Sequence, residues 1–160
     1  MLRAVSPNAA SLIGSTTNDN AAAGIVGEFI TATVAVGAAV ALATAVTSNI
    51  TSISLTAGDW KVWGTIQHNI GVATSITILQ GGLSLTTATI AGQAGGAGLG
   101  TDPTVIFTTV ATIPAGNISQ TTGPVRVSLA ATTTVFLVVR DTFTVSTVSA
   151  FGTISARRVR

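Results

Sequence analysis

Short segments rich in threonine and valine, separated by turn residues, constrain the fold of this chain more than any other feature. In "WKVWGTIQH" (60–68) inward and outward positions alternate, and similar alternation returns in "VRVSL" (125–129) and "VFLVVR" (135–140). A period of two is the pattern of a half-buried strand, and β-branched residues favour strands. No long segment shows the 3.6-residue apolar period of a helix. The chain is therefore expected to be all-β.

Glycine, proline and aspartate mark the expected turns between strands. These turns are "TAGD" (56–59), "QGG" (80–82), "GGAG" (95–98), "TDP" (101–103), "IPAGN" (113–117) and "TGP" (122–124). The predicted strands are 28–34, 39–46, 50–56, 59–68, 74–80, 83–90, 104–110, 124–130, 133–140 and 143–156. Many short antiparallel strands with frequent turns predict a two-sheet jelly-roll sandwich.

The domain organisation is expected to be simple. The chain has 160 residues, which suits one ordinary domain with its own core. Residues 1–26 are mostly small and polar, and we predict an N-terminal arm or linker of the kind that a partner orders. Residues 27–160 form the predicted jelly-roll domain.

The stretch "LTAGDWKVWGTIQ" (55–67) contains both tryptophans and the only lysine of the chain. We expect a turn in which Gly58 takes a positive φ, which glycine does without steric cost. The following strand should point Trp60 inward as a large core anchor. Trp63 then lies on the opposite face, either across the outer sheet or in an interface, where tryptophan is enriched.

Charged residues make up 8% of the chain, against roughly 25% in an average soluble domain. A monomer with so few charges is poorly protected against association. We therefore expect a surface coated with serine, threonine, asparagine and glutamine, and in addition burial between subunits. This predicts a homo-oligomer.

The basic residues form a tail and no basic face. Arg157, Arg158 and Arg160 lie in the last four positions, whereas nucleic-acid binding needs a stripe of lysine and arginine. The tail is either a solvated end or a cationic anchor for an acidic partner, with Val159 packed beneath it. Neighbouring strand residues face opposite ways, so Arg140 and the adjacent acid are expected to pair across strands or subunits. The interface candidates are Trp63, Arg140, Arg157, Arg158 and Arg160.

Residues for catalysis are scarce, and we predict no catalytic residue, no cofactor and no metal ligand. Cysteine is absent, and the single histidine, His68, lacks a GxSxG nucleophile motif to serve. We expect His68 to be a polar residue at a strand end or an interface. The glycine-rich stretch 92–100 lacks the Lys-Ser/Thr ending of a phosphate loop. The acids are scattered: Asp19, Glu28, Asp59, Asp102 and Asp141.

A membrane span is not expected. The uncharged stretch 29–46 is long enough to cross a bilayer, but it consists mostly of alanine, threonine, valine and glycine. No lysine or arginine cluster flanks it to set an orientation.

Three segments together resemble small structural proteins of tailed bacteriophages and prophages. They are "GEFITATV" (27–34), "NITSISLTAGDWKVWGTI" (49–66) and "VRVSLAATTTVFLVVRDTFTVSTVSAFGTISARRVR" (125–160), and the resemblance is weaker through 70–120. A glycine turn before a tryptophan strand is also shared by many C1q-like and TNF-like jelly rolls. The resemblance implies a virion component without catalysis, made in the bacterial cytoplasm, that assembles as a trimer or less often as a dimer.

Two functions follow from the resemblance as expectations. The first is a capsid decoration or cement protein that binds the major capsid protein or neighbouring virion proteins, with the arm 1–26 as a candidate attachment. The second is a tail-fibre or head-fibre knob whose loops 92–103 and 113–123 contact a host receptor. An enzyme or a membrane protein is the third and least favoured class.

Overall fold

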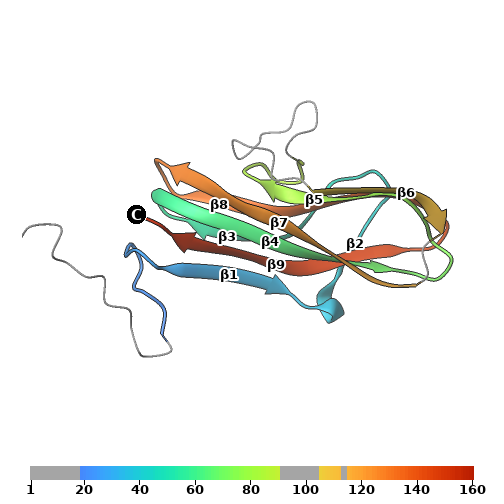
Figure 1. The fold of residues 1–160 in the computed structure, drawn as a ribbon, viewed down its shortest axis with the longest axis horizontal. Coiled ribbons are helices and arrows are strands. Elements are labelled where there is room, and N and C mark those ends of the chain that lie inside the picture. The colour runs from blue at the N-terminus through green and yellow to red at the C-terminus, as the bar shows by residue number, and fades with distance from the viewer. Residues whose placement is uncertain (1–18, 91–104, 113–114) are drawn as a thin grey trace, which may run out of the picture.

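The computed structural model describes residues 19–90, 105–112 and 115–160, which form two antiparallel sheets packed face to face (Figure 1). The predicted all-β sandwich is confirmed. The elements in chain order are β1 (Phe29–Val34), the short 3₁₀ helix η2 (Val36–Ala38), β2 (Val40–Ala41), β3 (Ser48–Leu55), β4 (Gly58–Ile70), β5 (Ser75–Ser84), β6 (Val105–Thr112), β7 (Gly116–Leu129), β8 (Thr133–Thr144) and β9 (Val148–Arg158).

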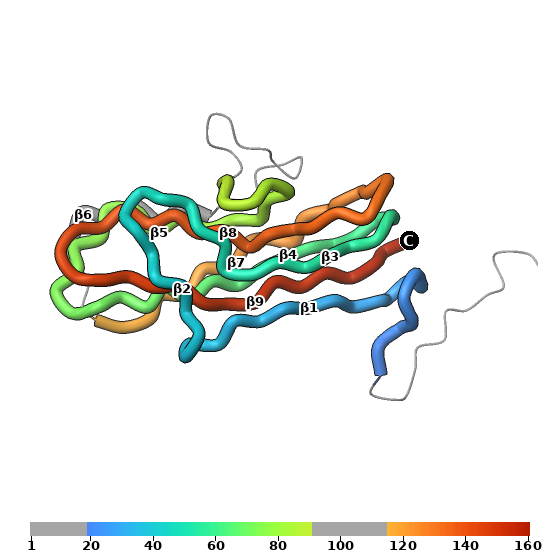
Figure 2. The backbone as a smooth tube through the Cα atoms, turned by 180° about the vertical axis from the view of Figure 1, so that it is seen from behind, coloured from blue at the N-terminus to red at the C-terminus, as the bar shows by residue number. Residues whose placement is uncertain are grey.

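The strand pairing is that of a jelly roll, as predicted. Strand β1 pairs with β9, β3 with β8, β4 with β7 and β5 with β6. These pairs are nested along the chain, from the outermost pair, β1 with β9, to the innermost pair, β5 with β6. The resulting sheets have the orders β1-β9-β4-β7, here called sheet A, and β3-β8-β5-β6, called sheet B. The short β2 extends the β1 edge along β9. The tube in Figure 2 shows β1 and β9, which are hydrogen-bonded neighbours, running side by side along the sandwich.

Several predicted strand boundaries are wrong. The "QGG" and "TGP" turns do not form, because β5 and β7 run straight through them, and 85–90 is not a strand. Of the predicted strand 39–46 only Val40–Ala41 is extended and paired. Residues 116–123 belong to β7, so the expected loop 113–123 is also wrong for those residues. The expected loop 92–103 lies outside the described residues, as do the turns at 95–98 and 101–103.

Packing explains why two glycines lie inside strands. A Cβ on Gly81 would collide with Ile66 of the opposite sheet, and a Cβ on Gly64 would collide with Leu137. Glycine in a strand interior often marks such a close approach rather than a turn. Pro124 lies in β7 where the register with β4 shifts between Val62 and Gly64, and a proline is tolerated at such a bulge.

The core confirms the predicted parity of β4. Trp60, Val62, Ile66 and His68 are fully buried between the sheets, whereas Trp63 points to the outer side and is half-buried. The indole Nε1 of Trp60 donates to the Thr56 carbonyl at 2.9 Å, which satisfies its one polar atom. A second apolar cluster fills the other end of the sandwich, formed by Ile70, Ile76, Leu79, Phe143 and Val148.

The outer face of sheet B is partly covered by the chain itself. After β5 the segment 85–90 reaches β3, where Asn49 donates to Thr87 Oγ1 at 2.7 Å and accepts from the Ala88 amide at 2.8 Å. Because β8 lies between β5 and β3, this segment crosses β8, and the outward side chain of Val138 is fully buried. The outer face of sheet A is therefore the more open face in the described part of the chain.

Candidate functional site

Arg158 and the turn before β4 form one end of the sandwich. Gly58 has the expected positive φ of 139°, and a Cβ there would collide with the Arg158 guanidinium. Nη1 of Arg158 donates to the Ala57 carbonyl at 2.9 Å, and Nη2 donates to the Thr56 hydroxyl. The guanidinium carbon lies 4.2 Å from the centre of the Trp60 ring, a cation–π contact.

Glu28 completes this arrangement from the N-terminal side. Its Oε2 accepts from Arg158 Nε at 2.9 Å and from the Gly24 amide at 2.8 Å. The Gly24 amide, helped by Arg158, holds the pKa of Glu28 below its ordinary value, although burial acts in the opposite direction. Arg158 is only 5% exposed and is bound to Glu28, so little of its side chain is left for contact with another subunit.

A second carboxylate, Asp59, is also buried and paired. Arg126 binds it through two nitrogens at 2.8 to 3.0 Å, and Arg160 Nε donates to it at 2.7 Å. The hydrogen bond from Arg126 is the largest cause that lowers the pKa of Asp59, and it raises the pKa of Arg126 in turn. Both arginines are largely exposed, so the pair is screened by water and contributes little stability.

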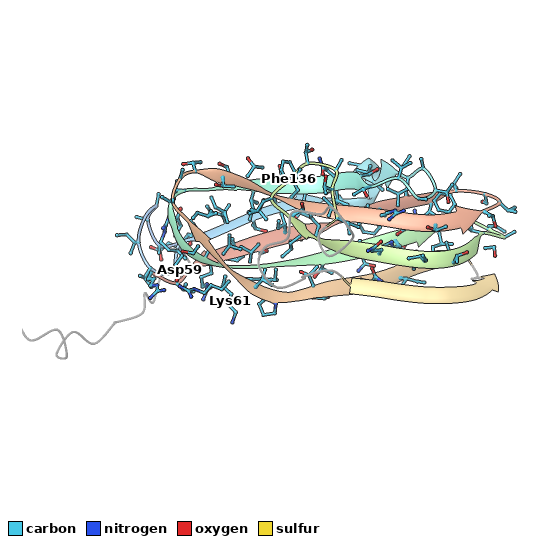
Figure 3. All side chains as sticks on the ribbon, turned by 90° about the horizontal axis from the view of Figure 1, so that it is seen from above. Asp59, Lys61 and Phe136 are labelled. Atoms are coloured by element: carbon cyan, nitrogen blue, oxygen red, sulfur yellow. The ribbon has the colours of Figure 1, made fainter. Side chains whose placement is uncertain are left out.

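Burial of the acids leaves this end of the surface positive. Three carboxylates of the described chain, Glu28, Asp59 and Asp141, are at least 94% buried, and Asp19 is the exposed acid there. The exposed cations of the same end are Lys61, Arg126, Arg157 and Arg160. Figure 3 shows Lys61 projecting away from the ribbon close to Asp59.

Three of these cations lie side by side across sheet A. In the register, Arg157 of β9 is opposite Lys61 of β4, and Lys61 is opposite Arg126 of β7. Like charges directly opposite each other in a sheet are destabilising. Asp59 compensates Arg126, but neither Lys61 nor Arg157 forms an ion pair within the described residues.

Next to these two cations is a shallow pocket of about 520 Å³ on the outer face of sheet A. Trp63 forms part of its wall, 6.0 Å from the Phe29 ring, which itself lies under Arg157 at 5.8 Å. The β7 bulge supplies the opposite wall. The pocket is lined by Lys61, Trp63, Thr121, Thr122, Pro124, Arg157 and Val159.

The bulge is built by a buried hydroxyl. Thr122 is 1% exposed, and its Oγ1 accepts from the Gly64 amide at 2.8 Å, which replaces a ladder bond where the register shifts. The bulge places Pro124 and the exposed Thr121 beside Trp63. A smaller hollow of about 350 Å³ lies beyond Arg157 and Phe29, and Asp19 and Asn20 line it.

A separate polar cluster lies in the core between the sheets. His68 Nδ1 is 2.8 Å from Asp141 Oδ2, and His68 Nε2 is 2.9 Å from Gln120 Oε1. Gln120 Nε2 donates to the Leu79 carbonyl at 3.3 Å, and the backbone amide of Gln80 donates to Asp141 Oδ1 at 3.3 Å. Because both ring nitrogens face oxygen acceptors, His68 donates on both sides only when both nitrogens carry a proton.

The His68 cluster connects the two sheets. His68 and Gln120 come from sheet A, whereas Asp141 and Gln80 come from sheet B. His68 and Asp141 have the pairing of an acyl-transfer triad, but Gln120 occupies the place where a nucleophile hydroxyl belongs. Both side chains of the pair are 0% exposed, so this geometry offers a substrate no access. His68 lies close to the end of β4, as expected, and it has the inward parity of Trp60. Because it is fully buried between the sheets, it does not lie at a surface interface.

The structure divides the remaining interface candidates. Trp63 and Arg157 lie together in the pocket, and Arg160 lies at the same end, bound to Asp59. Arg140 is on sheet B, half-buried, with Nε donating to the Ala45 carbonyl at 3.1 Å. Sequence reasoning missed Lys61 as a site residue. Its position two residues before Trp63 puts it on the same face of β4, which the alternation alone could have indicated.

Within the described ranges, no three histidine or acidic side chains gather as the ligands of a metal ion do. The helices of the described chain include none with the length and apolar character that crossing a membrane requires. Comparisons with family models, curated proteins and solved structures find no match to this chain.

Proposed function

We propose that this protein is a non-enzymatic structural component of a bacteriophage virion, a decoration or cement protein that binds the head lattice as a β-rich oligomer. The observation that supports an assembling role best is the part of the outer face of sheet A beyond the pocket, where the described residues carry no charge. Register-aligned rows of uncharged and mostly polar residues cross the strands there. The rows contain Thr33, Thr153 and Thr65, then Phe151, Gln67 and Ser119, then Ser149, Asn69 and Asn117.

Such a face is suited to contact between subunits. Its polar side chains hydrogen-bond to each other across neighbouring strands, so they can be buried at low cost. The Thr33 and Thr153 hydroxyls are 2.9 Å apart, and Gln67 Nε2 donates to the Ser119 hydroxyl at 3.1 Å. Charged residues are depleted at the centre of protein interfaces. Lys61 and Arg157 would repel their own copies around a symmetry axis, which confines the contact to the uncharged rows. We favour a trimer, with a dimer as the alternative.

Attachment to the capsid is proposed to use residues 1–18. The sandwich is already fastened from residue 19 onward, because Asn20 and Phe29 exchange two hydrogen bonds and the Gly27 amide donates to the Arg158 carbonyl at 3.0 Å. Deleting residues 1–18 leaves these contacts in place, so we expect the truncated chain to fold. The proposed partners are the major capsid protein or neighbouring virion proteins, and the proposed location is the virion surface.

The attachment is tested by titrating labelled protein onto phage particles stripped of it. We expect saturable binding in fixed ratio to the capsid subunits, and loss of that binding when residues 1–18 are deleted. Circular dichroism should show that the truncated protein stays folded. Equal binding by the truncated protein would refute the arm, and no capsid binding by the full chain would refute the decoration role.

The subunit contact has its own test in analytical ultracentrifugation. Thr65→Arg places a charge in the middle of the proposed contact and should shift the oligomer towards monomer. Thr134→Arg adds the same charge to the exposed outer side of sheet B and is the matched control. If both variants keep the oligomer of the unmodified chain, sheet A is not the contact.

The pocket beside Trp63 favours a second candidate, a fibre knob that binds a host-surface receptor. An open pocket with an aromatic wall and two cations without carboxylate partners is a feature of a ligand-binding surface. Binding to intact host cells without binding to the capsid shell would support this candidate over decoration.

A further inference from the structure

We propose that the pocket formed by Lys61, Trp63, Thr121 and Arg157 binds an acidic saccharide, that is, a sugar ring that carries a carboxylate. This site goes beyond the proposed virion role and does not depend on it. Its volume of about 520 Å³ falls within the range of about 300–1,000 Å³ that is usual for small-molecule sites.

The charge of the ligand follows from the cations. Lys61 and Arg157 face each other directly across β4 and β9, an arrangement that costs stability when it stays uncompensated. The two buried carboxylates of that end are already bound, Asp59 by Arg126 and Arg160 and Glu28 by Arg158. A carboxylate between Lys61 and Arg157 would remove the repulsion and gain charge-assisted hydrogen bonds from both.

The ring of the ligand follows from Trp63. Its indole contacts Phe29 at a centroid distance of 6.0 Å and remains partly exposed at the pocket. The electron-rich face of an indole attracts the slightly positive C–H groups on the flat side of a sugar ring. A free phosphate or an isolated carboxylate would leave this surface unused.

The hydroxyls of the ligand have a partner on the β7 side. Thr121 is exposed at the pocket and can both donate and accept, whereas the hydroxyl of Thr122 is already bound to Gly64. The pocket thus presents an aromatic surface, two cations and a hydroxyl within one shallow hollow. This combination matches a carboxylated sugar better than a neutral sugar or a simple anion.

The test uses calorimetric titration of the full chain at physiological salt, where non-specific attraction is screened. The probes are trigalacturonic acid, its methyl ester, which keeps the rings and removes the charge, and triglutamate, which keeps the carboxylates and removes the rings. We expect binding of the acid and much weaker binding of the other two. Tryptophan fluorescence should change with the acid, and the change reports Trp63 because Trp60 is fully buried.

Variants locate the binding. Arg157→Gln and Lys61→Met should each weaken binding of the acid about fivefold, the size of one partly exposed ion pair. Trp63→Ala should abolish the binding, whereas Trp63→Phe should retain part of it. Arg160→Gln removes a cation from the same end but outside the pocket, and it should change nothing.

Several results would overturn the proposal. They are no binding of the acid, equal binding of its methyl ester, equal binding of triglutamate, or an equal loss in Arg160→Gln. The outcome is separable from the proposed virion role. Arg157→Gln should bind stripped particles as the unmodified chain does. A failure of saccharide binding would therefore refute the pocket proposal without affecting the capsid titration.

Discussion

The buried pair of His68 and Asp141 gives the sharpest stability prediction. Both side chains are 0% exposed, so neither can regain water if its partner is removed. Each single substitution leaves two buried polar groups without a hydrogen-bond partner, and each such group costs about 1–3 kcal/mol. We expect Asp141→Val and His68→Leu each to lose about 4 kcal/mol, against a total stability of about 5–15 kcal/mol for a domain of ordinary size.

The double variant separates the pair from its surroundings. With both groups apolar, neither is left without the other, and the residual cost comes from the Gln120 side chain and the Gln80 backbone amide, which lose their partners. An unsatisfied buried group costs about 1–3 kcal/mol. The double variant should therefore lose about 2–5 kcal/mol, well below the sum of about 8 kcal/mol for the two single variants.

The assay is urea denaturation followed by tryptophan fluorescence, at one fixed protein concentration because an oligomer gains stability from association. Thr134→Ala is the control, since Thr134 is exposed on the outer side of sheet B, away from the proposed subunit contact. It should change the stability by no more than about 0.5 kcal/mol. Additive losses in the double variant would refute a coupled pair between the sheets.

Three further predictions concern the core and the Arg158 end. Trp60→Ala should cost about 3–5 kcal/mol in urea denaturation because a fully buried anchor is lost, and a near-neutral result would contradict its place in the core. Gly81→Ala should cost about 1–3 kcal/mol through overpacking against Ile66, and combining it with Ile66→Val should restore part of the loss; no rescue would point to a backbone cause. The pKa of Glu28 lies below its ordinary value of 4.5, so its contribution is complete above that pH and is lost as the pH falls through the lower, folded value. Urea midpoints of Glu28→Gln should therefore differ from those of the unmodified chain most at neutral pH and converge in acid, and a gap that widens in acid would be inconsistent with the ion pair to Arg158.

Much of the candidate site could be predicted from local sequence. Trp63 and Lys61 share a face because they are two residues apart in a strand, and both tryptophans have the parity that the alternation predicts. Arg157 was identified from its place in the terminal basic cluster. Its position opposite Lys61 could not be predicted, because it depends on the register between two strands that are distant in the chain.

The wrong predictions have a common physical cause. The sequences "QGG" and "TGP" predict turns from local backbone preferences. In the structure Gly81 instead leaves room for Ile66 of the opposite sheet, and Pro124 lies at a β-bulge. Arg158 belongs to a sequence that resembles a frayed tail, yet Trp60, Glu28 and the turn before β4 enclose it. In each case the role of the residue is set by neighbours that the local sequence does not contain.

By itself, the sequence determined the all-β class, the inward and outward sides of the long strands, and the turn at Gly58. These features depend on backbone preferences and a two-residue period, which act over a few neighbouring residues. Only the tertiary structure decided that His68 meets Asp141 and that Arg157 stands beside Lys61 and Trp63. Strand pairing is decided by which faces bury each other across the whole chain, so the residues that share a site are brought together only when the two sheets close.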